Sequence, residues 1–128
     1  MSKFFFICLG GAIGTGARYL ISGWALQLFG TSFPYGTLTV NLLGAFLIGL
    51  IMHLGLNTEL LSPSLRIVLT TGVLGGFTTY SSFNYETVQY LQEGGWQRGV
   101  TNISVMLVGC LAAGLIGLAL ARRSRSIA

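Results

Sequence analysis

Two charged side chains, Arg18 and Glu86, stand inside long apolar segments of the chain. A charged group in such surroundings costs at least about a few kcal/mol unless it reaches water, finds a partner or extends to a polar boundary. A functional role is therefore the first interpretation for both residues. The alternatives are an Arg18 guanidinium that reaches the boundary along its aliphatic stem, and a Glu86 carboxylate that solvent holds near the boundary.

Asn41 is the centre of a polar stripe. Thr37 lies four residues before it, and Gly44 and Ala45 lie three and four residues after it. On a helix these residues share one face of a cylinder that is otherwise Leu, Ile and Val. The Asn41 amide either hydrogen-bonds a neighbouring helix or lines a polar pathway, and the stripe alone leaves both interpretations open.

The segment 70–86 combines Thr, Gly, Ser and aromatic residues. Tyr80 and Phe83 are three residues apart and share a helical face with Asn84 and Thr87. The edge of an aromatic ring is electropositive and can receive an anion. Packing in a core is the alternative interpretation of the two rings.

Residues for catalysis or for a metal cluster are too few. His53 is the only histidine, and no second His, Cys pair or carboxylate stands at metal-ligand spacing, so we expect an interfacial residue near a helix end. Cys8 and Cys110 both lie in apolar stretches, where a thiol behaves as a small hydrophobe. No Ser-His-Asp or Cys-His set can be assembled, and we expect no enzyme.

The composition indicates whether these residues lie in a water-soluble protein or in a membrane protein. Of the 128 residues, 52% are hydrophobic and 8% are charged, and the mean hydropathy is +0.75. Soluble domains carry about 25% charged residues, so the sequence predicts a membrane protein. The net charge is +4, but three of the seven basic residues stand in the last seven positions. The positive charge is a topology signal, and we expect no nucleic-acid partner.

Stretches without an acidic or basic side chain set the number of spans. They run for 34 residues after Arg18, 19 after Arg66 and 23 after Arg98, and about 20 apolar residues cross a bilayer. With loops at the Gly, Pro and Asn clusters, the sequence predicts an all-α membrane protein with four transmembrane helices, at about 4–29, 34–56, 64–92 and 97–121. We expect one transmembrane domain over 1–128.

The third of these helices is expected to break near 75–79. Gly75 and Gly76 each cost about 1 kcal/mol relative to Ala in a helix, and the following Thr78 and Thr79 add to this. A break in the membrane frees backbone carbonyls, which neighbours, water or a cation must satisfy. Four thin helices enclose little interior, and glycines at four-residue spacing favour close helix contacts, so we expect a dimer.

The basic residues predict the orientation. With four spans both termini share one side, and that side holds five basic residues against Arg98 alone on the other: Lys3, Arg66, Arg122, Arg123 and Arg125. This count predicts cytoplasmic termini. Without the three C-terminal arginines, which are synthesised last, the balance is two to one, and insertion in both orientations becomes feasible.

Three segments carry a resemblance to a known family. They are 14–19 (Gly-Thr-Gly-Ala-Arg-Tyr), 36–44 (Gly-Thr-Leu-Thr-Val-Asn-Leu-Leu-Gly) and 75–83 (Gly-Gly-Phe-Thr-Thr-Tyr-Ser-Ser-Phe). With the four-span length, they make the chain resemble the Fluc/CrcB fluoride channels over essentially its whole length. The family motif in the third helix is Gly-Gly-x-Thr-Thr-Phe-Ser-Thr-Phe. This chain departs from it at Tyr80, where the family has Phe, and at Ser82, where Thr is usual.

The resemblance implies an architecture and a function. It implies an antiparallel, dual-topology homodimer in the bacterial inner membrane, with two pores that export fluoride passively. It also implies a structural sodium ion on the two-fold axis, held by the backbone carbonyls of Gly75 and Thr78 from both subunits. The expected partners are therefore fluoride, sodium, the lipid bilayer and a second copy of the chain.

The resemblance also assigns roles to single residues. Asn41 corresponds to the pore asparagine of the family, and Tyr80 and Phe83 correspond to its aromatic box. Ser81 corresponds to part of a polar track. Glu86 corresponds to a conduction-related carboxylate, and Arg18 to the first-helix arginine of the family. In such a pore, the Asn41 amide and the Ser81 hydroxyl would replace the water around fluoride.

Two other functions remain open at this point. A proton-coupled small multidrug exporter is also a tiny four-helix, dual-topology dimer. Its essential carboxylate lies in the first helix, where this chain has Arg18, whereas Glu86 is in the third. A non-transporting assembly subunit would leave Asn41, Tyr80 and Phe83 without a purpose.

Overall fold

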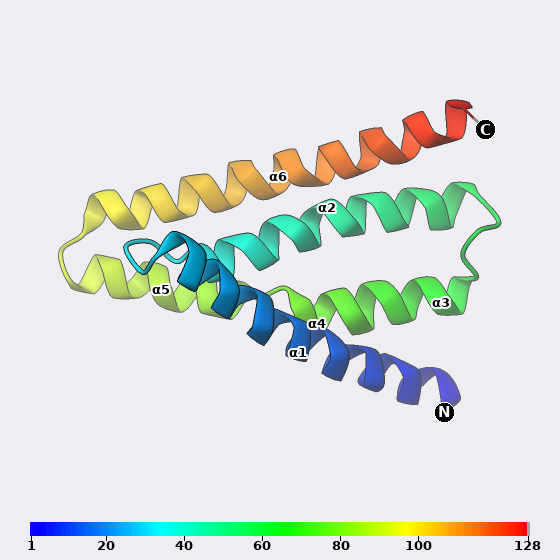
Figure 1. Ribbon diagram of the computed structural model, residues 1–128, viewed down its shortest axis with the longest axis horizontal. Helices are drawn as coiled ribbons and strands as arrows, with labels where there is room; N and C mark the ends of the chain where they lie inside the picture. The colour runs from blue at the N-terminus through cyan, green and yellow to red at the C-terminus, as the bar shows by residue number, and fades with distance from the viewer. Residues whose placement is uncertain (128) are drawn as a thin grey trace.

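The computed structural model describes residues 1–127, and within this range every regular element is a helix. The elements are α1 (Ser2–Phe29), α2 (Tyr35–Asn57), α3 (Pro63–Ile67), the wider π-helical η1 (Val68–Leu74), α4 (Gly75–Phe77), α5 (Tyr80–Gln92) and α6 (Trp96–Ile127). Both termini lie at the same end of the bundle (Figure 1). The prediction of an all-α chain is confirmed.

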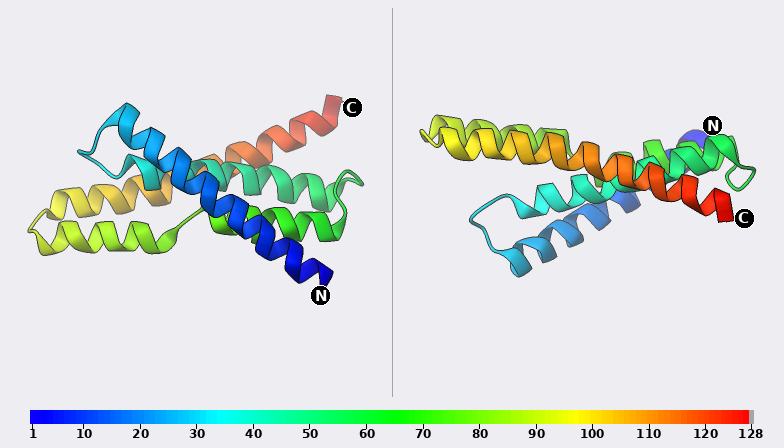
Figure 2. Two further views of the ribbon diagram at one scale, coloured as in Figure 1. Left: turned by 60° about the horizontal axis from the view of Figure 1, so that its bottom comes forward. Right: turned by 90° about the horizontal axis from the view of Figure 1, so that it is seen from above.

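Three helices are long and apolar enough to cross a membrane: α1, α2 and α6. Between α2 and α6, the shorter elements α3, η1, α4 and α5 follow one another back along the length of the molecule (Figure 1). At the end away from the termini, the α1–α2 connection and the α5–α6 connection lie well apart, so the bundle is splayed there (Figure 2).

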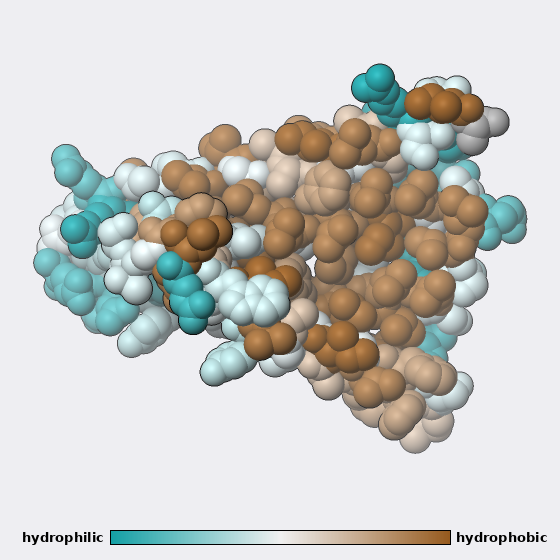
Figure 3. All heavy atoms as spheres, viewed as in Figure 1, coloured by the Kyte–Doolittle hydropathy of each residue, from teal (hydrophilic) through white to brown (hydrophobic). Residues whose placement is uncertain are grey.

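The buried core is small. It centres on Val40, Leu74 and Phe77, and most large apolar side chains are exposed. The space-filling view shows a nearly continuous hydrophobic face between more polar ends (Figure 3). An apolar surface of this extent is suited to lipid, and together with the three apolar helices it confirms the prediction of a membrane protein.

Glycines bring α1 against η1 and α4. A Cβ atom on Gly14 would overlap the carbonyl oxygen of Val73, and a Cβ atom on Gly76 would overlap the carbonyl oxygen of Gly11. Neither position therefore accepts a larger residue without moving a backbone. These small residues at four-residue spacing are used for packing within one chain.

The backbone is extended at two residues between α4 and α5. Thr78 has φ −86° and ψ 159°, and Thr79 has φ −151° and ψ 112°. The Thr78 hydroxyl donates to the Leu74 carbonyl at 2.9 Å, which closes the preceding turn. The Thr79 hydroxyl accepts from the Ser82 amide at 3.1 Å, so Thr79 is the N-cap that starts α5. Thr78 and Thr79 are called the interruption below.

α6 continues to Ile127, six residues past the end that the apolar pattern indicates. The extra residues include Arg122, Arg123 and Arg125, and arginine is a good helix former. The apolar pattern therefore marks where the hydrophobic stretch ends, while the helix continues beyond it.

Candidate functional site

The side chain of Asn41 on α2 holds the interruption by its backbone. Its Nδ2 donates to the Thr79 carbonyl at 3.0 Å, and its Oδ1 accepts from the Thr79 amide at 2.8 Å. In a continuous helix the Thr79 amide would donate to the Gly75 carbonyl. One carboxamide thus satisfies both backbone groups of an extended residue, using a donor and an acceptor at once.

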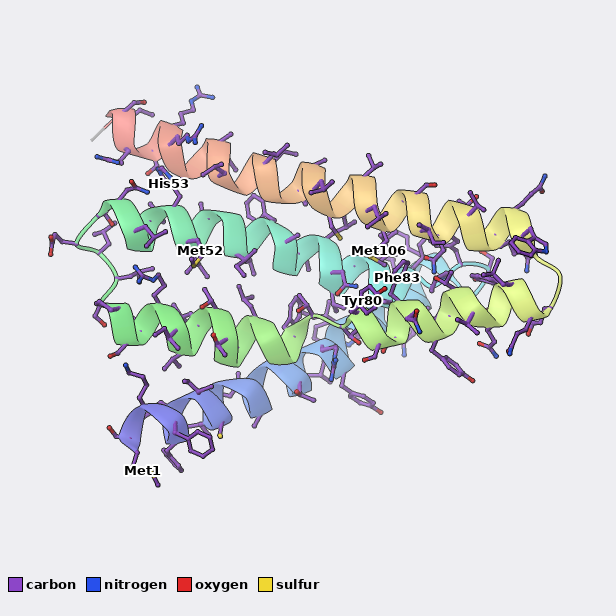
Figure 4. The ribbon with its side chains drawn as sticks, turned by 180° about the vertical axis from the view of Figure 1, so that it is seen from behind. Met1, Met52, His53, Tyr80, Phe83 and Met106 are labelled. Carbon is purple, nitrogen blue, oxygen red and sulfur yellow. The ribbon has the colours of Figure 1, made fainter. Side chains whose placement is uncertain are left out.

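A groove of about 500 Å³ lies beside this clamp. It is bounded by α2, the interruption, α5 and α6, and its lining includes Asn41, Thr78, Tyr80, Phe83 and Met106. The rings of Tyr80 and Phe83 meet edge to face, with centroids 5.7 Å apart and planes at 65° (Figure 4). Phe83 is buried, whereas Tyr80 is 75% exposed. We call this space the Asn41 groove.

Arg18 reaches the interruption from α1. Its Nη1 donates to the Thr78 carbonyl at 3.4 Å. Arg18 also lines a smaller hollow of about 310 Å³ together with Thr37, Thr79 and Ser82. The interruption is therefore contacted by a cationic side chain from α1 and by an amide from α2.

The Gly75 and Thr78 carbonyl oxygens are among those that lose their regular helical partners here. The Gly75 carbonyl loses the Thr79 amide, which donates to Asn41, and the Thr78 carbonyl loses the Ser82 amide, which donates to Thr79 Oγ1. Uncharged oxygen donors of this kind fit a hard monovalent cation. Residues 1–127 contain no group of three or more His, Cys, Asp and Glu that could hold a metal ion.

Glu86 on α5 accepts a hydrogen bond from a side chain of α2. The Thr37 hydroxyl donates to its Oε1 at 2.6 Å, while Oε2 is buried without a hydrogen-bond partner among the described residues. Thr37 lies one turn before Asn41, so a single stripe of α2 contacts both Glu86 and the interruption. The carboxylate is thus fixed close to the site without an ion pair.

Comparison with known proteins decides the family. The profile described as CrcB-like protein, Camphor Resistance (CrcB), matches residues 5–118. The chain belongs to the CrcB family. It is 55% identical over 123 residues to the "Fluoride-specific ion channel FluC" of Sorangium cellulosum (strain So ce56), covering 96% of this chain and 97% of that protein.

Two further relatives of this CrcB-family chain carry the same name. The protein of Anaeromyxobacter dehalogenans (strain 2CP-1 / ATCC BAA-258) is 48% identical over 122 residues, covering 95% of this chain and 97% of the relative. The protein of Citrifermentans bemidjiense is also 48% identical over 122 residues, covering 95% of this chain and 98% of the relative. The similarity therefore extends over nearly the whole length of both chains.

The structure brings together most of the residues that the sequence singled out. Asn41, Tyr80 and Phe83 share one groove, and Arg18 and Glu86 reach its surroundings through the Thr78 carbonyl and Thr37. Ser81 is exposed and is absent from the residues that line this groove. His53 lies farther along α2, at the end near the termini (Figure 4).

Sequence reasoning missed Asn102 of the CrcB-family fold. This residue of α6 is fully buried, and its Nδ2 donates to Thr87 Oγ1 at 3.0 Å. The Thr87 hydroxyl in turn donates to the Phe83 carbonyl at 2.8 Å. Asn102 of α6 is therefore linked through Thr87 to the backbone of Phe83. A carboxamide in the charge-free stretch between Arg98 and Arg122 was the signal that could have identified it.

Proposed function

We propose that this chain is a fluoride-selective passive ion channel that exports fluoride across the membrane. The observation that carries the proposal is that Asn41, Tyr80 and Phe83 line one groove, in which the two rings meet edge to face. The names of relatives that match 95% or more of the chain point to the same ion.

The groove offers what a small, strongly hydrated anion needs. Fluoride must exchange its water for hydrogen-bond donors or electropositive edges. One Asn41 N–H is used by the Thr79 carbonyl, and Nδ2 also lies 3.5 Å from the Met106 sulfur, a weak acceptor. Fluoride is a far better acceptor than a thioether and displaces it. The Tyr80 hydroxyl and the two ring edges supply further positive surface.

A second copy completes the pathway. We take α3, η1, α4 and α5 as one broken crossing, which makes four crossings in a single transmembrane domain over 1–128. The Asn41 groove is open on one side, and Tyr80 at its rim is 75% exposed. An antiparallel partner inserted in the opposite orientation in the bacterial inner membrane covers that side, makes two pores and receives the exposed Ser81 hydroxyl.

The carbonyls of Gly75 and Thr78 from both subunits would hold a structural sodium ion. One chain supplies one carbonyl from each of these residues, and the partner's equivalent pair would complete the oxygen shell around a cation. A sodium ion held there would supply a positive charge shared by the two interruptions. Arg18, which donates to the Thr78 carbonyl, would have to release it, because a guanidinium and a cation repel each other.

Glu86 lies beside the route near one mouth. A bare carboxylate would repel an approaching anion. The Thr37 hydroxyl donates to Oε1, so one oxygen of the carboxylate is occupied by a donor from α2.

Fluoride efflux from liposomes, measured with and without a proton gradient, tests the function. We expect efflux in both conditions and strong rejection of chloride. Efflux that requires the gradient would favour a proton-coupled exporter. No efflux at all, from protein that is folded and inserted, would favour an assembly subunit.

A further inference from the structure

A side chain with an unpartnered buried nitrogen lies at the other end of α2. His53 is the only histidine of the chain and lines a groove of about 530 Å³ between α2 and α6, together with Met52, Gly114 and Leu118. We call this space the His53 groove. It shares four lining residues with the Asn41 groove, namely Ala45, Ile48, Cys110 and Leu111. The two grooves therefore adjoin along α2, and the twelve residues from Asn41 to His53 span about 18 Å.

Asn57 determines which ring nitrogen of His53 carries the proton. Its side-chain nitrogen Nδ2 donates to the His53 carbonyl at 3.0 Å and lies 3.2 Å from His53 Nδ1. A carbonyl only accepts, so the atom of Asn57 at this position must be the amide nitrogen. His53 Nδ1 is then the acceptor of the second bond, and in the neutral ring Nε2 bears the hydrogen.

This N–H has no acceptor. His53 Nε2 is buried and has no hydrogen-bond partner among the described residues. Leaving a buried donor unpaired is unfavourable, so such a group is best explained by a ligand that accepts. The surrounding groove is mostly apolar, and Asn57 lines it together with His53.

The charges at this end favour an anion. Arg66 donates from Nη1 to the Gly55 carbonyl at 2.7 Å, two residues beyond His53. The last turns of α6 carry Arg122, Arg123 and Arg125, against Glu59 in the α2–α3 connection. Clustered positive charge raises the local concentration of anions.

We propose that His53 Nε2–H is a further fluoride contact, at the mouth of the pathway nearest the termini. The inference rests on the proposed fluoride channel and adds an entry or exit site to it. Asn57 is a positioning residue, because its contact with Nδ1 selects the tautomer in which Nε2 bears the hydrogen.

The single histidine permits a direct binding test. The full chain, labelled with ¹⁵N-histidine in lipid nanodiscs at about pH 8, is titrated with sodium fluoride, and the imidazole resonances are recorded. We expect saturable shifts with fluoride and none with equal sodium chloride. Shifts that are absent, or identical with both salts, would overturn the proposal.

Flux measurements give a second readout. His53→Gln places an amide N–H near the position of Nε2, whereas His53→Leu removes the donor. We expect His53→Leu to lower the fluoride efflux rate at limiting fluoride by about tenfold, as the loss of one hydrogen bond to a charged group predicts, and His53→Gln to retain most of it. Equal rates in both variants would contradict a donor role for His53. Absence of fluoride efflux from the wild-type chain would instead refute the channel itself, whatever the histidine signals show.

Discussion

At the scale of residues, the structure gives Asn41 two tasks, which use different hydrogen-bonding groups of the same amide. It clamps the Thr79 backbone through both side-chain atoms, and it faces the groove with the N–H that lies near Met106. A residue that only packed helices together would not need to contact an extended backbone. The clamp also explains why an asparagine, with one donor group and one acceptor, stands at this position.

Asn41→Leu is expected to remove both functions of that amide. Two buried backbone groups of Thr79 would be left unpaired, and we expect a loss of about 2–4 kcal/mol in unfolding free energy, together with a loss of fluoride efflux. Thermal unfolding in detergent and liposome efflux measure the two effects. Unchanged stability with unchanged flux would return Asn41 to a simple packing role.

Glu86→Gln separates the charge from the hydrogen bond. In the wild type the Thr37 hydroxyl donates to Glu86 Oε1 at 2.6 Å. The glutamine Oε1 can accept the same bond, so we expect the variant to fold and dimerise. The negative charge beside the route is lost, and we expect bilayer recordings to show an altered conductance and an altered dependence on pH. If both remain as in the wild type, Glu86 is an interfacial residue without a part in conduction.

Tyr80→Phe restores the residue that the family motif has at this position. The hydroxyl adds a donor and volume to a ring that meets Phe83 edge to face at 5.7 Å. Tighter binding slows exit, because conduction requires binding weak enough to release the ion. We expect a higher unitary fluoride rate with chloride still excluded. A single-channel current that is equal or lower would show that the hydroxyl does not obstruct the path.

At the scale of elements, the close crossing of α1 over η1 and α4 presents the interruption to Arg18. Gly14 and Gly76 allow the backbones to approach, and the Arg18 guanidinium then reaches the Thr78 carbonyl. The α2 stripe contacts the same segment from another side. The interruption is therefore held by its neighbours, as freed backbone groups in a membrane must be.

Gly14→Ala tests this crossing, with Gly16→Ala as the matched control. A Cβ atom on Gly14 would overlap the Val73 carbonyl, whereas nothing lies within 4 Å of a Cβ atom on Gly16. We expect Gly14→Ala to lower the unfolding free energy by about 1–3 kcal/mol, as overpacking does, and to weaken the Arg18–Thr78 contact. Gly16→Ala should unfold close to the wild-type temperature. Equal unfolding temperatures for the two variants would contradict the crossing.

The elements show what sequence patterns reveal and where they fail. Apolar length placed the long helices, and the poor helix formers around Gly75 pointed to the range in which Thr78 and Thr79 are extended. The π-helical geometry of η1, which packs against α1, has no such signal in the sequence. The Asn102–Thr87 bond joins α6 to α5 and depends on helix register, which spacing within one helix does not determine.

At the scale of the whole molecule, one end of the bundle collects most of the positive charge. Lys3, Arg66 and the three arginines near the C-terminus belong to the end where both termini lie, and Arg98 follows the connection at the other end (Figure 1). Such a bias favours one orientation. The proposed antiparallel dimer requires both orientations from the same chain.

Labelling a cysteine near the C-terminus shows whether the chain inserts in one orientation or in both. Ser126→Cys, in a chain whose Cys8 and Cys110 are changed to Ala, places one thiol in the exposed last turn of α6. Since the bias without the late-synthesised arginines is weak, we expect a membrane-impermeant maleimide to label about half of the chains in sealed inner-membrane vesicles.

Replacing Arg98, the single basic residue at the other end, changes the charge bias between the two ends. Arg98→Gln leaves only the terminal end positively charged, so we expect the labelled fraction to move away from one half, toward the value for cytoplasmic termini. Fluoride efflux should fall in parallel, because chains of the minority orientation limit the number of antiparallel pairs. Labelling of nearly all or nearly none of the wild-type chains would exclude the antiparallel dimer. The open side of the Asn41 groove would then have to be covered by a parallel partner or by lipid.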